Sequence, residues 1–508
     1  MPTLGLGHSL VFLSFFTGLY AYTWPSNIDY LEGVTYQQAG YRRFGVIDGV
    51  NPCSFSSEGE GKQAAAEWVR TAFHDMITHN AAEGTGGMDA SIMFEMDRPE
   101  NPGSAFNATM NFMVNFYNIQ TSMADLFALA AHTAIRSCGG PRLAMRGGRV
   151  DAIGAGVAGV PEPTDDLDTI VTQFATAGFN TTEMIQMVAC GHTLGGVHGV
   201  DFPEITGDNS STNFVHFDST FSSFDSAVVT DYLDGTTENP LVVGPEGTNS
   251  DLLVFSADGN ATMQRMIDVV PSSVTLSEVI DPIPIKPVAI QMAFDSNGVL
   301  TFTGEIRVLI SNREDTDLTA QLHYADHDGN IPSNNTISTA EIHMTGYGFD
   351  AEFKFYSFSA AVPNGVSSFN ITVIPSSGEE ERYDNGGSGY PIQDTIVFLS
   401  SHSCLVQETD ANGNWNLTAV AAVRNDALST NPSFDVVVKT QRIGIPIPSL
   451  AVESSAMELW NSDMYDGFTL YAGHLSLPIY SWSTTFDVTV GEYSDLFKSS
   501  GGLSGTCS

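Results

Sequence analysis

Apolar residues recur every three to four positions in four stretches of the first half of the chain, a spacing typical of helices with one buried face. These stretches are 62–77, 122–138, 165–178 and 181–195. Asp165 or Asp166 and Thr181 are the expected N-caps, and Gly139 and Gly178 mark expected helix ends. The first half is therefore predicted to be mainly α-helical.

The pattern changes at a proline-punctuated segment, DPIPIKPV, at 281–288. Beyond it, short alternating or β-branched runs such as VLTFTGEIRVLI and WNLTAVAAVR are separated by turn residues. This pattern predicts antiparallel strands in one or two β-sandwiches. FNITV at 369–373 and FDVTV at 486–490 hint at a sandwich repeated on the two sides of residue 400. The expected fold class is multidomain, with a mainly α domain followed by an all-β region.

An apolar run at 9–22 is too short to span a membrane, and it resembles a secretory signal peptide cleaved near Ala21 to Thr23. No Lys or Arg precedes the run, which is unusual for such a peptide. The expected division of the chain is a signal peptide at 1–22, an N-terminal extension at 23–60, the helical domain at 61–280, a linker at 281–288, and sandwiches at 289–400 and 401–508.

Composition supports a folded and secreted protein. The chain has 508 residues, 42% hydrophobic and 15% charged, and its formal charge of -40 makes nucleic acid and anionic membranes poor partners. Five cysteines allow two disulfides; pairing Cys53 with Cys138 and Cys404 with Cys507 keeps each bridge within one half and leaves Cys190 free. Seven N-x-S/T sequons agree with secretion; they begin at Asn107, Asn180, Asn209, Asn260, Asn334, Asn370 and Asn416.

Two histidines stand in helical stretches. Arg70 and His74 are four residues apart, so both side chains can reach one small ligand from the same helix face. His192 follows an apolar helical stretch. Taken singly, the first pair also fits an ordinary amphipathic helix, and the second fits a structural core histidine.

Two loops alternate carboxylate, hydroxyl and carbonyl oxygens, the ligand type that calcium prefers. The first is Gly87-Met-Asp89-Ala-Ser91, and the second is Phe217-Asp218-Ser-Thr220-Phe-Ser-Ser223-Phe-Asp225. Ordinary turns contain the same residues, so each loop alone leaves both readings open.

Taken together, in this order and spacing, the motifs resemble those of the secreted fungal branch of the plant-type haem peroxidase superfamily. The resemblance covers roughly residues 60–270 and includes RTAFHD, GGMDAS, the PEN segment ending at Asn101, GGRVDA, VPEP, GHTLG, FDST and NSDLLV. It implies haem b and two calcium ions as cofactors, with hydrogen peroxide and a small aromatic reductant as substrates.

The resemblance also implies a role for each matching residue. His192 would be the axial iron ligand, and Asp251 would accept a hydrogen bond from its other ring nitrogen. His74 would move a proton between the oxygens of hydrogen peroxide, with Arg70 stabilising negative charge and Asn101 orienting the imidazole. The distal calcium ligands would be Asp75, Gly87, Asp89 and Ser91. The proximal calcium ligands would be Thr193, Asp218, Thr220, Ser223 and Asp225. Asp125 and Arg149 would form a buried ion pair.

Departures from the family patterns narrow the expected substrate. Phe73 and Phe217 stand where the intracellular cytochrome c peroxidase type has tryptophan, which favours the secreted type. The three carboxylates of manganese peroxidases are matched by Gln63, Glu67 and His198, a set that should bind Mn²⁺ poorly. Met187 stands at the position of the exposed tryptophan of lignin peroxidases.

We therefore expect a secreted, monomeric haem peroxidase of generic type that oxidises small phenols by one-electron steps. The alternative is a cell-wall or glycan-binding adhesin with a catalytically weak peroxidase-like domain. The sequence assigns no chemistry to the β region, which fits a spacer or stability module about as well as a contact with polysaccharide.

Overall fold

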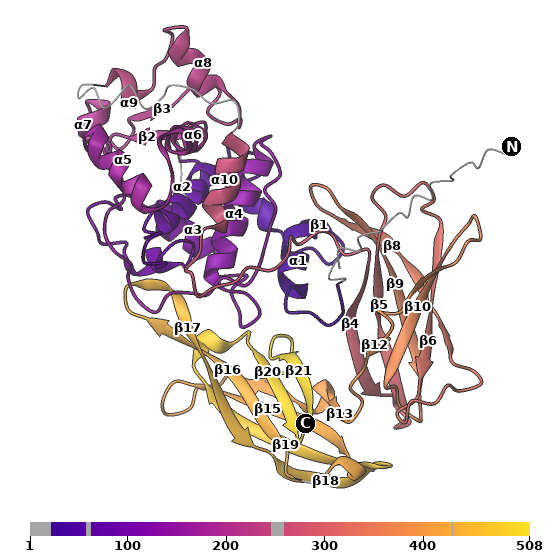
Figure 1. Ribbon diagram of the computed structural model, residues 1–508. Helices are drawn as coiled ribbons and strands as arrows, with labels where there is room; N and C mark the ends of the chain where they lie inside the picture. The colour runs from indigo at the N-terminus through magenta and orange to yellow at the C-terminus, as the bar shows by residue number, and fades with distance from the viewer. Residues whose placement is uncertain (1–21, 57–61, 245–258, 429, 508) are drawn as a thin grey trace, which may run out of the picture.

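The computed structural model describes residues 22–56, 62–244, 259–428 and 430–507. It confirms the expected fold class, with a mainly helical domain followed by two pairs of β-sheets (Figure 1). The expected signal peptide lies outside the described residues except for Tyr22. No helix in the described ranges has the length and apolar character needed to cross a membrane.

The helical domain is organised around α4, which is buried from Met123 to Ile135. The main helices are α2 (Ala64–Met76), α3 (Ala105–Met113), α4 (Met123–Ser137), α5 (Leu167–Thr176), α6 (Thr181–Gly191) and α10 (Gly259–Asp268). Shorter elements are η2 (Ser91–Phe94), α7 (Pro203–Thr206), α8 (Ala227–Leu233), α9 (Pro240–Val243) and a hairpin of β2 (Gly196–His198) and β3 (Phe214–His216). The four helical stretches expected from periodicity correspond to α2, α4, α5 and α6.

One expected helix cap is displaced by a residue. The N-cap of α5 is Asp166, one of the two expected residues, and its side chain accepts a hydrogen bond from the amide of Thr169. The N-cap of α6 is Asn180 and not Thr181, because the Asn180 side chain accepts from the amides at the start of the helix. The Glu183 carboxylate accepts a hydrogen bond from the Asn180 amide, which completes a capping box.

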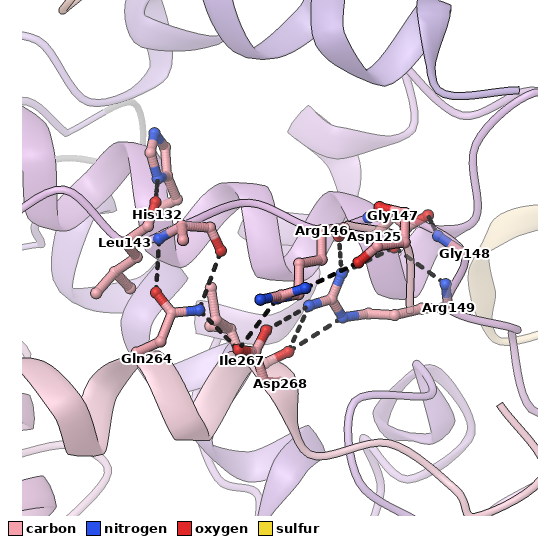
Figure 2. Close-up of polar contacts among 12 residues, drawn as sticks. Asp125, His132, Leu143, Arg146, Gly147, Gly148, Arg149, Gln264, Ile267 and Asp268 are labelled. Carbon is pink, nitrogen blue, oxygen red and sulfur yellow. Dashed lines mark hydrogen bonds and ion pairs between the residues drawn. The ribbon is translucent and has the colours of Figure 1, made fainter. Parts of the chain in front are cut away.

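A buried polar network joins α4 to α10 (Figure 2). The expected ion pair is confirmed, with Arg149 Nη1 2.9 Å from Asp125 Oδ1. Arg149 also donates from Nε to the carbonyl of Ile267 on α10, at 3.1 Å. Gln264 of α10 bonds both the amide and the carbonyl of Ala144. The network therefore fixes where α10 lies in the helical domain.

The β region forms two sandwich-like pairs of sheets. In the first pair one sheet has the order β1-β8-β9-β5-β4, where β1 is Ala39–Gly40, and the other has the order β11-β10-β6-β7, with β12 on β10. Their strands are β4 (Ile285–Phe294), β5 (Leu300–Leu309), β6 (Leu318–Ala325), β7 (Thr336–Ser338), β8 (Ala340–Tyr347), β9 (Glu352–Ala361), β10 (Ser368–Pro375), β11 (Glu381–Tyr383) and β12 (Tyr390–Pro391).

The second pair contains sheets of order β13-β15-β19-β18, with β14 on β15, and β17-β16-β20-β21. Their strands are β13 (Ile396–Phe398), β14 (Cys404–Val406), β15 (Trp415–Arg424), β16 (Ser433–Arg442), β17 (Ile445–Ala456), β18 (Glu458–Tyr465), β19 (Phe468–Leu477), β20 (Thr485–Val490) and β21 (Tyr493–Ser499).

Two segments differ from the sequence-based division. The segment 281–288 was expected to be a linker, but β4 begins within it at Ile285. Pro287 is accommodated because β4 is an edge strand, where a missing backbone donor costs little. The second difference is β13, which pairs with β15, so the second pair of sheets begins upstream of residue 401.

The N-terminal extension joins the helical domain to the first sandwich. It contains α1 (Asp29–Tyr36), β1 (Ala39–Gly40) and η1 (Val46–Gly49), and β1 pairs with β8 at the edge of a sheet. Glu32 of α1 is fully buried and pairs with Lys286 at 2.8 Å and with Arg307. A buried carboxylate held by two cations leaves this helix little freedom to move away from the sheet.

The hydrophobic cores cross the domain boundaries. Phe353 and Phe355 of β9 and Ile447 of β17 belong to the core of the helical domain. A second core contains residues from both sandwiches. Both expected disulfides are present: Cys53–Cys138 in the helical domain, and Cys404–Cys507 in the second sandwich. Cys190 is a half-buried free thiol.

Candidate active site

Two histidines from different helices line one cavity of about 310 Å³ in the helical domain. His74 lies in the last turn of α2, and His192 directly follows α6. Arg70, Phe73 and Phe217 also line this cavity, which we call the two-histidine cavity. The structure therefore brings together residues that are up to 147 positions apart, from Arg70 to Phe217.

The ring of His74 is held by a buried amide. Its Nδ1 lies 2.7 Å from Oδ1 of Asn101, and Asn101 in turn donates from Nδ2 to the carbonyl of Glu95, at 3.0 Å. Because Nδ2 of Asn101 is already engaged as a donor, its Oδ1 faces His74 and must accept, so Nδ1 carries the hydrogen. Nε2 of His74 carries the lone pair, which accepts a hydrogen bond from Nε of Arg70. Burial first, and then the charge of Arg70, lower the pKa of His74 to about 3. The imidazole is therefore neutral near neutral pH, with its lone pair on Nε2.

Arg70 lies beside His74 within the same cavity. Its Nε is 3.4 Å from Nε2 of His74, and its Nη2 donates to the carbonyl of Pro102 at 3.0 Å. The ring of Phe106 lies under the guanidinium at 4.7 Å and next to the His74 ring at 4.9 Å. Burial lowers the pKa of Arg70 to about 10, so the side chain stays positively charged near neutral pH.

His192 presents a different environment. Its ring centroid is 4.4 Å from that of Phe217, and burial, followed by the charge of Arg70, lowers its pKa to about 4. Its Nδ1 is buried and has no hydrogen-bond partner within the described ranges. Asp251, the expected partner, lies outside the described residues. A neutral imidazole with one ring nitrogen needing an acceptor is suited to binding a metal through the other nitrogen.

The first oxygen-rich loop gathers around Asp75, directly after His74. The Asp75 carboxylate accepts from the amides of Asp89, Ala90 and Ile92 at 2.8 to 3.1 Å. Burial, and then the neighbouring Asp89, raise the pKa of Asp75. The hydroxyl of Ser91 is buried without a hydrogen-bond partner in the part of the chain that is described. Gly87 sits in the same loop with a φ of +104°, which favours glycine. Two crowded carboxylates beside a buried hydroxyl fit a bound cation.

The second oxygen-rich loop gathers around Thr193, directly after His192. Thr193 Oγ1 lies 3.0 Å from the Asp225 carbonyl and 3.4 Å from the Ser223 carbonyl. Thr220 donates to the Asp225 carboxylate, at 2.9 Å. Asp218 Oδ2 is buried without a partner among the described atoms, and burial followed by nearby carboxylates raises its pKa to about 6. All five expected ligands of this site therefore lie together.

The donor chemistry of both loops is oxygen-based. In the described ranges no cluster of three or more His, Cys, Asp or Glu side chains is arranged to hold a metal. Any cation at these loops would depend on hydroxyl and carbonyl oxygens beside the carboxylates, which suits calcium better than zinc or iron.

The cavity also has wall and rim residues that the sequence did not single out. Met263 and Met266 of α10 and Phe174 of α5 form apolar wall, while Asp201 adds a carboxylate near Arg70. Met263 and Met266 lie far along the chain, and Asp201 lies in a loop between β2 and α7, where no local motif indicates a cavity. The periodicity around Phe174 predicts a helix but not what this side chain faces. Met187 also lines the wall and is 2% exposed.

The two-histidine cavity therefore brings together the imidazoles of His74 and His192 and the guanidinium of Arg70, between mainly apolar walls. The family model described as Peroxidase matches residues 55–269. Residues 55–269 therefore form a domain of the plant and fungal peroxidase superfamily, and a large β region follows this domain in the chain.

Relatives match the chain to different extents. A "WSC domain-containing protein" of Arthroderma benhamiae is 39% identical over 96% of this chain and 68% of its own length. Versatile peroxidase VPS1 of Pleurotus eryngii is 31% identical over 40% of this chain and 55% of its own length. Manganese peroxidase H4 of Phanerodontia chrysosporium is 31% identical over 35% of this chain and 46% of its own length. The chain thus spans about half the length of these two peroxidases.

Proposed function

We propose that the protein is a secreted haem peroxidase that reduces hydrogen peroxide and oxidises small phenolic or similar reductants one electron at a time. The observation that carries this proposal is the asymmetry of the two-histidine cavity. His74 is bonded to Asn101 and lies beside Arg70, whereas His192 has a buried Nδ1 in need of an acceptor.

The cavity residues fit haem b. His192 would bind the iron through Nε2, and Phe73 and Phe217 would contact the porphyrin from the apolar wall. Asp251 would accept the hydrogen bond from Nδ1 and so raise the basicity of the imidazole. When bound, haem supplies an iron centre that takes up two oxidising equivalents from hydrogen peroxide and returns them singly.

His74, Arg70 and Asn101 act on hydrogen peroxide by transferring a proton and stabilising negative charge. His74 Nε2 accepts a proton from one oxygen of hydrogen peroxide and delivers it to the other, which leaves as water. Arg70 stabilises the negative charge that builds up on the leaving oxygen. Asn101 keeps the His74 hydrogen on Nδ1, so that Nε2 is available. Two reductant molecules each lose one electron and one proton, and the net products are two waters and two radicals.

The expected calcium ions would be structural. The ligand loops directly follow the two histidines in sequence, at Asp75 and at Thr193. Cations there would relieve repulsion among buried carboxylates and fix the ends of α2 and α6.

A generic reductant fits the cavity rim better than Mn²⁺. Of the three positions that match the manganese ligands, only Glu67 is a carboxylate. The Gln63 side chain donates to the Cys53 carbonyl at 2.8 Å, which directs it toward the backbone. Met187 is buried in the wall, so this position offers no exposed redox side chain.

Exposed glycosylation sequons and disulfides support secretion. All seven sequon asparagines are exposed, as glycosylation requires: Asn107, Asn180, Asn209, Asn260, Asn334, Asn370 and Asn416. Two disulfides fit an oxidising compartment.

A cell-wall or glycan-binding adhesin is the second candidate. It is favoured by the name of the relative that matches 96% of the chain, which refers to a WSC domain and not to a peroxidase. A Soret band together with turnover of a phenolic dye by hydrogen peroxide would support the enzyme. His74→Ala should keep haem yet lose about 10²- to 10⁴-fold in peroxide turnover, whereas His323→Ala on β6 should not change it. Haem-free protein that binds cell-wall polysaccharide would instead support the adhesin.

A further inference from the structure

The C-terminal sandwich contacts the side of the helical domain that carries His74. The strand β17 packs against α3 and η2, and Ile447 of β17 is fully buried in the helical core. In Figure 1 the β17 end of this sandwich lies next to the helical domain. The β region is thus in direct contact with α3, which lines the two-histidine cavity through Ala105, and with η2.

Arg442, at the end of β16, is the main polar contact. Its Nε donates to the Ile447 carbonyl at 2.9 Å, which braces the hairpin between β16 and β17. Its Nη2 lies 3.4 Å from Sδ of Met93, and its guanidinium carbon is 5.2 Å from the ring centre of Phe94. Arg442 therefore links its own hairpin to η2 across the domain boundary.

The inner side of η2 touches the residues that orient His74. The amide of Ile92 donates to the Asp75 carboxylate at 3.1 Å, and Asp75 adjoins His74. The carbonyl of Glu95, next after η2, accepts from Asn101 at 3.0 Å. The segment 91–95 is thus held between Arg442 on the outside and the partners of His74 on the inside.

The contact of β17 with α3 also reaches the surroundings of His74. Helix α3 carries Phe106, whose ring lies 4.9 Å from the His74 ring and 4.7 Å from the Arg70 guanidinium carbon. Strand β17 therefore contacts two elements, η2 and α3, that pack close to the side chains of His74 and Arg70.

We propose that Arg442 and the start of β17 form a positioning element for the peroxide-binding side of the cavity, so that the C-terminal sandwich takes part in setting the geometry of His74. This inference rests on the proposed function for its catalytic consequence, and on the contacts above for its structural one. Arg442 acts through η2 and is a positioning residue.

Hydrogen exchange in the full-length protein tests the structural part. Arg442→Ala should accelerate exchange of amides in residues 89–101 about three- to tenfold, the range expected when one partly buried cation–ring contact is lost. Strand β15, in the other sheet of the second sandwich, should be unchanged. Arg382→Ala, whose side chain is 79% exposed on the first sandwich, is the matched control. If Arg442→Ala cannot be purified, Arg442→Met keeps the apolar stem and removes the donors.

A double-variant cycle tests whether the contact itself is responsible. Phe94→Leu should produce a similar acceleration, and combining it with Arg442→Ala should add little, because both remove the same contact. The rate of reaction with hydrogen peroxide should fall in parallel, with a smaller change in reductant KM.

Unchanged exchange in 89–101, or acceleration spread evenly over all domains, would overturn the proposal. A parent protein that shows no reaction with peroxide would end the proposed function, yet the exchange data would still decide the positioning role.

Discussion

Replacing Asn101 with leucine should slow the reaction with hydrogen peroxide by a modest and calculable factor. The variant removes the acceptor at 2.7 Å that fixes the hydrogen of His74 on Nδ1. A hydrogen bond between two neutral groups contributes about 0.5–1.5 kcal/mol. Since about 1.4 kcal/mol is tenfold in rate, the second-order rate constant should fall roughly two- to thirteenfold. His74→Ala, which removes the base itself, should cost about 10²- to 10⁴-fold.

The assay is stopped-flow absorbance in the Soret region at several peroxide concentrations. Because Asn101 acts through His74, the double variant His74→Ala with Asn101→Leu should react no more slowly than His74→Ala alone. Asn115→Leu, an exposed asparagine two residues beyond α3, is the control for the substitution type. A loss for Asn101→Leu as large as that for His74→Ala, or a further loss in the double variant, would refute this reasoning.

Four more outcomes are expected. Glu32→Ala should lower the free energy of unfolding by about 3–5 kcal/mol, because it leaves Arg307 buried without its charge partner; Asp48→Ala, at an exposed ion pair, should cost less than about 1 kcal/mol in the same denaturation experiment. Burial raises the pKa of Glu32, but the charges of Lys286 and Arg307 together lower it more, so the pKa lies below its usual 4.5. Its stabilising effect is therefore complete above pH 4.5 and is lost as the pH falls below that value, so Glu32→Gln should flatten the acid side of the melting-temperature profile. Treatment with a calcium chelator should lower thermal stability and haem retention, and Asp218→Asn should reduce the effect of the chelator; equal sensitivity of parent and variant would argue against the second loop as a cation site. Turnover with Mn²⁺ as the sole reductant should not saturate at micromolar Mn²⁺, and Glu67→Gln should leave phenol oxidation unchanged; saturation would restore the manganese hypothesis.

The sequence indicated which candidate residues lie together better than it indicated the full lining of the cavity. The spacing of Arg70 and His74 on one helix face is local information, and the structure keeps the two side chains adjacent. The pairing of Asn101 with His74 followed only from the resemblance, because the two residues are 27 positions apart and most of the segment between them lacks periodicity. The rim carboxylate of Asp201 could not be predicted, since its position depends on how a loop folds back over the cavity.

Helices and strands were predicted correctly where their buried positions form a regular pattern of apolar residues in the sequence. Strands with alternating or continuous apolar residues, such as β16 and β15, were visible in the sequence. By contrast, β18 is mostly exposed and lacks a hydrophobic face, and β4 contains a proline, so local patterns gave no strand there. The role of the N-terminal extension depends on Glu32 meeting Arg307, a contact across 275 positions that no local pattern encodes.

The β region makes structural contacts with the helical domain and is more than a spacer. Shared cores and the Arg442 contacts indicate that the helical domain and the second sandwich are not independent modules. Removing the chain beyond residue 280 would expose Phe94 and leave Glu32 without both of its cations. Experiments on the peroxidase activity should therefore use the whole chain.

The most direct measurement is the absorbance spectrum of haem-replete, full-length protein before and after one equivalent of hydrogen peroxide. Our account predicts a Soret band that shifts within milliseconds and returns when a phenol is added. The shift should be lost in His74→Ala, and haem should no longer be retained in His192→Ala. A spectrum that stays unchanged with peroxide, or full haem retention without the His192 imidazole, would contradict the assignment of iron to this cavity.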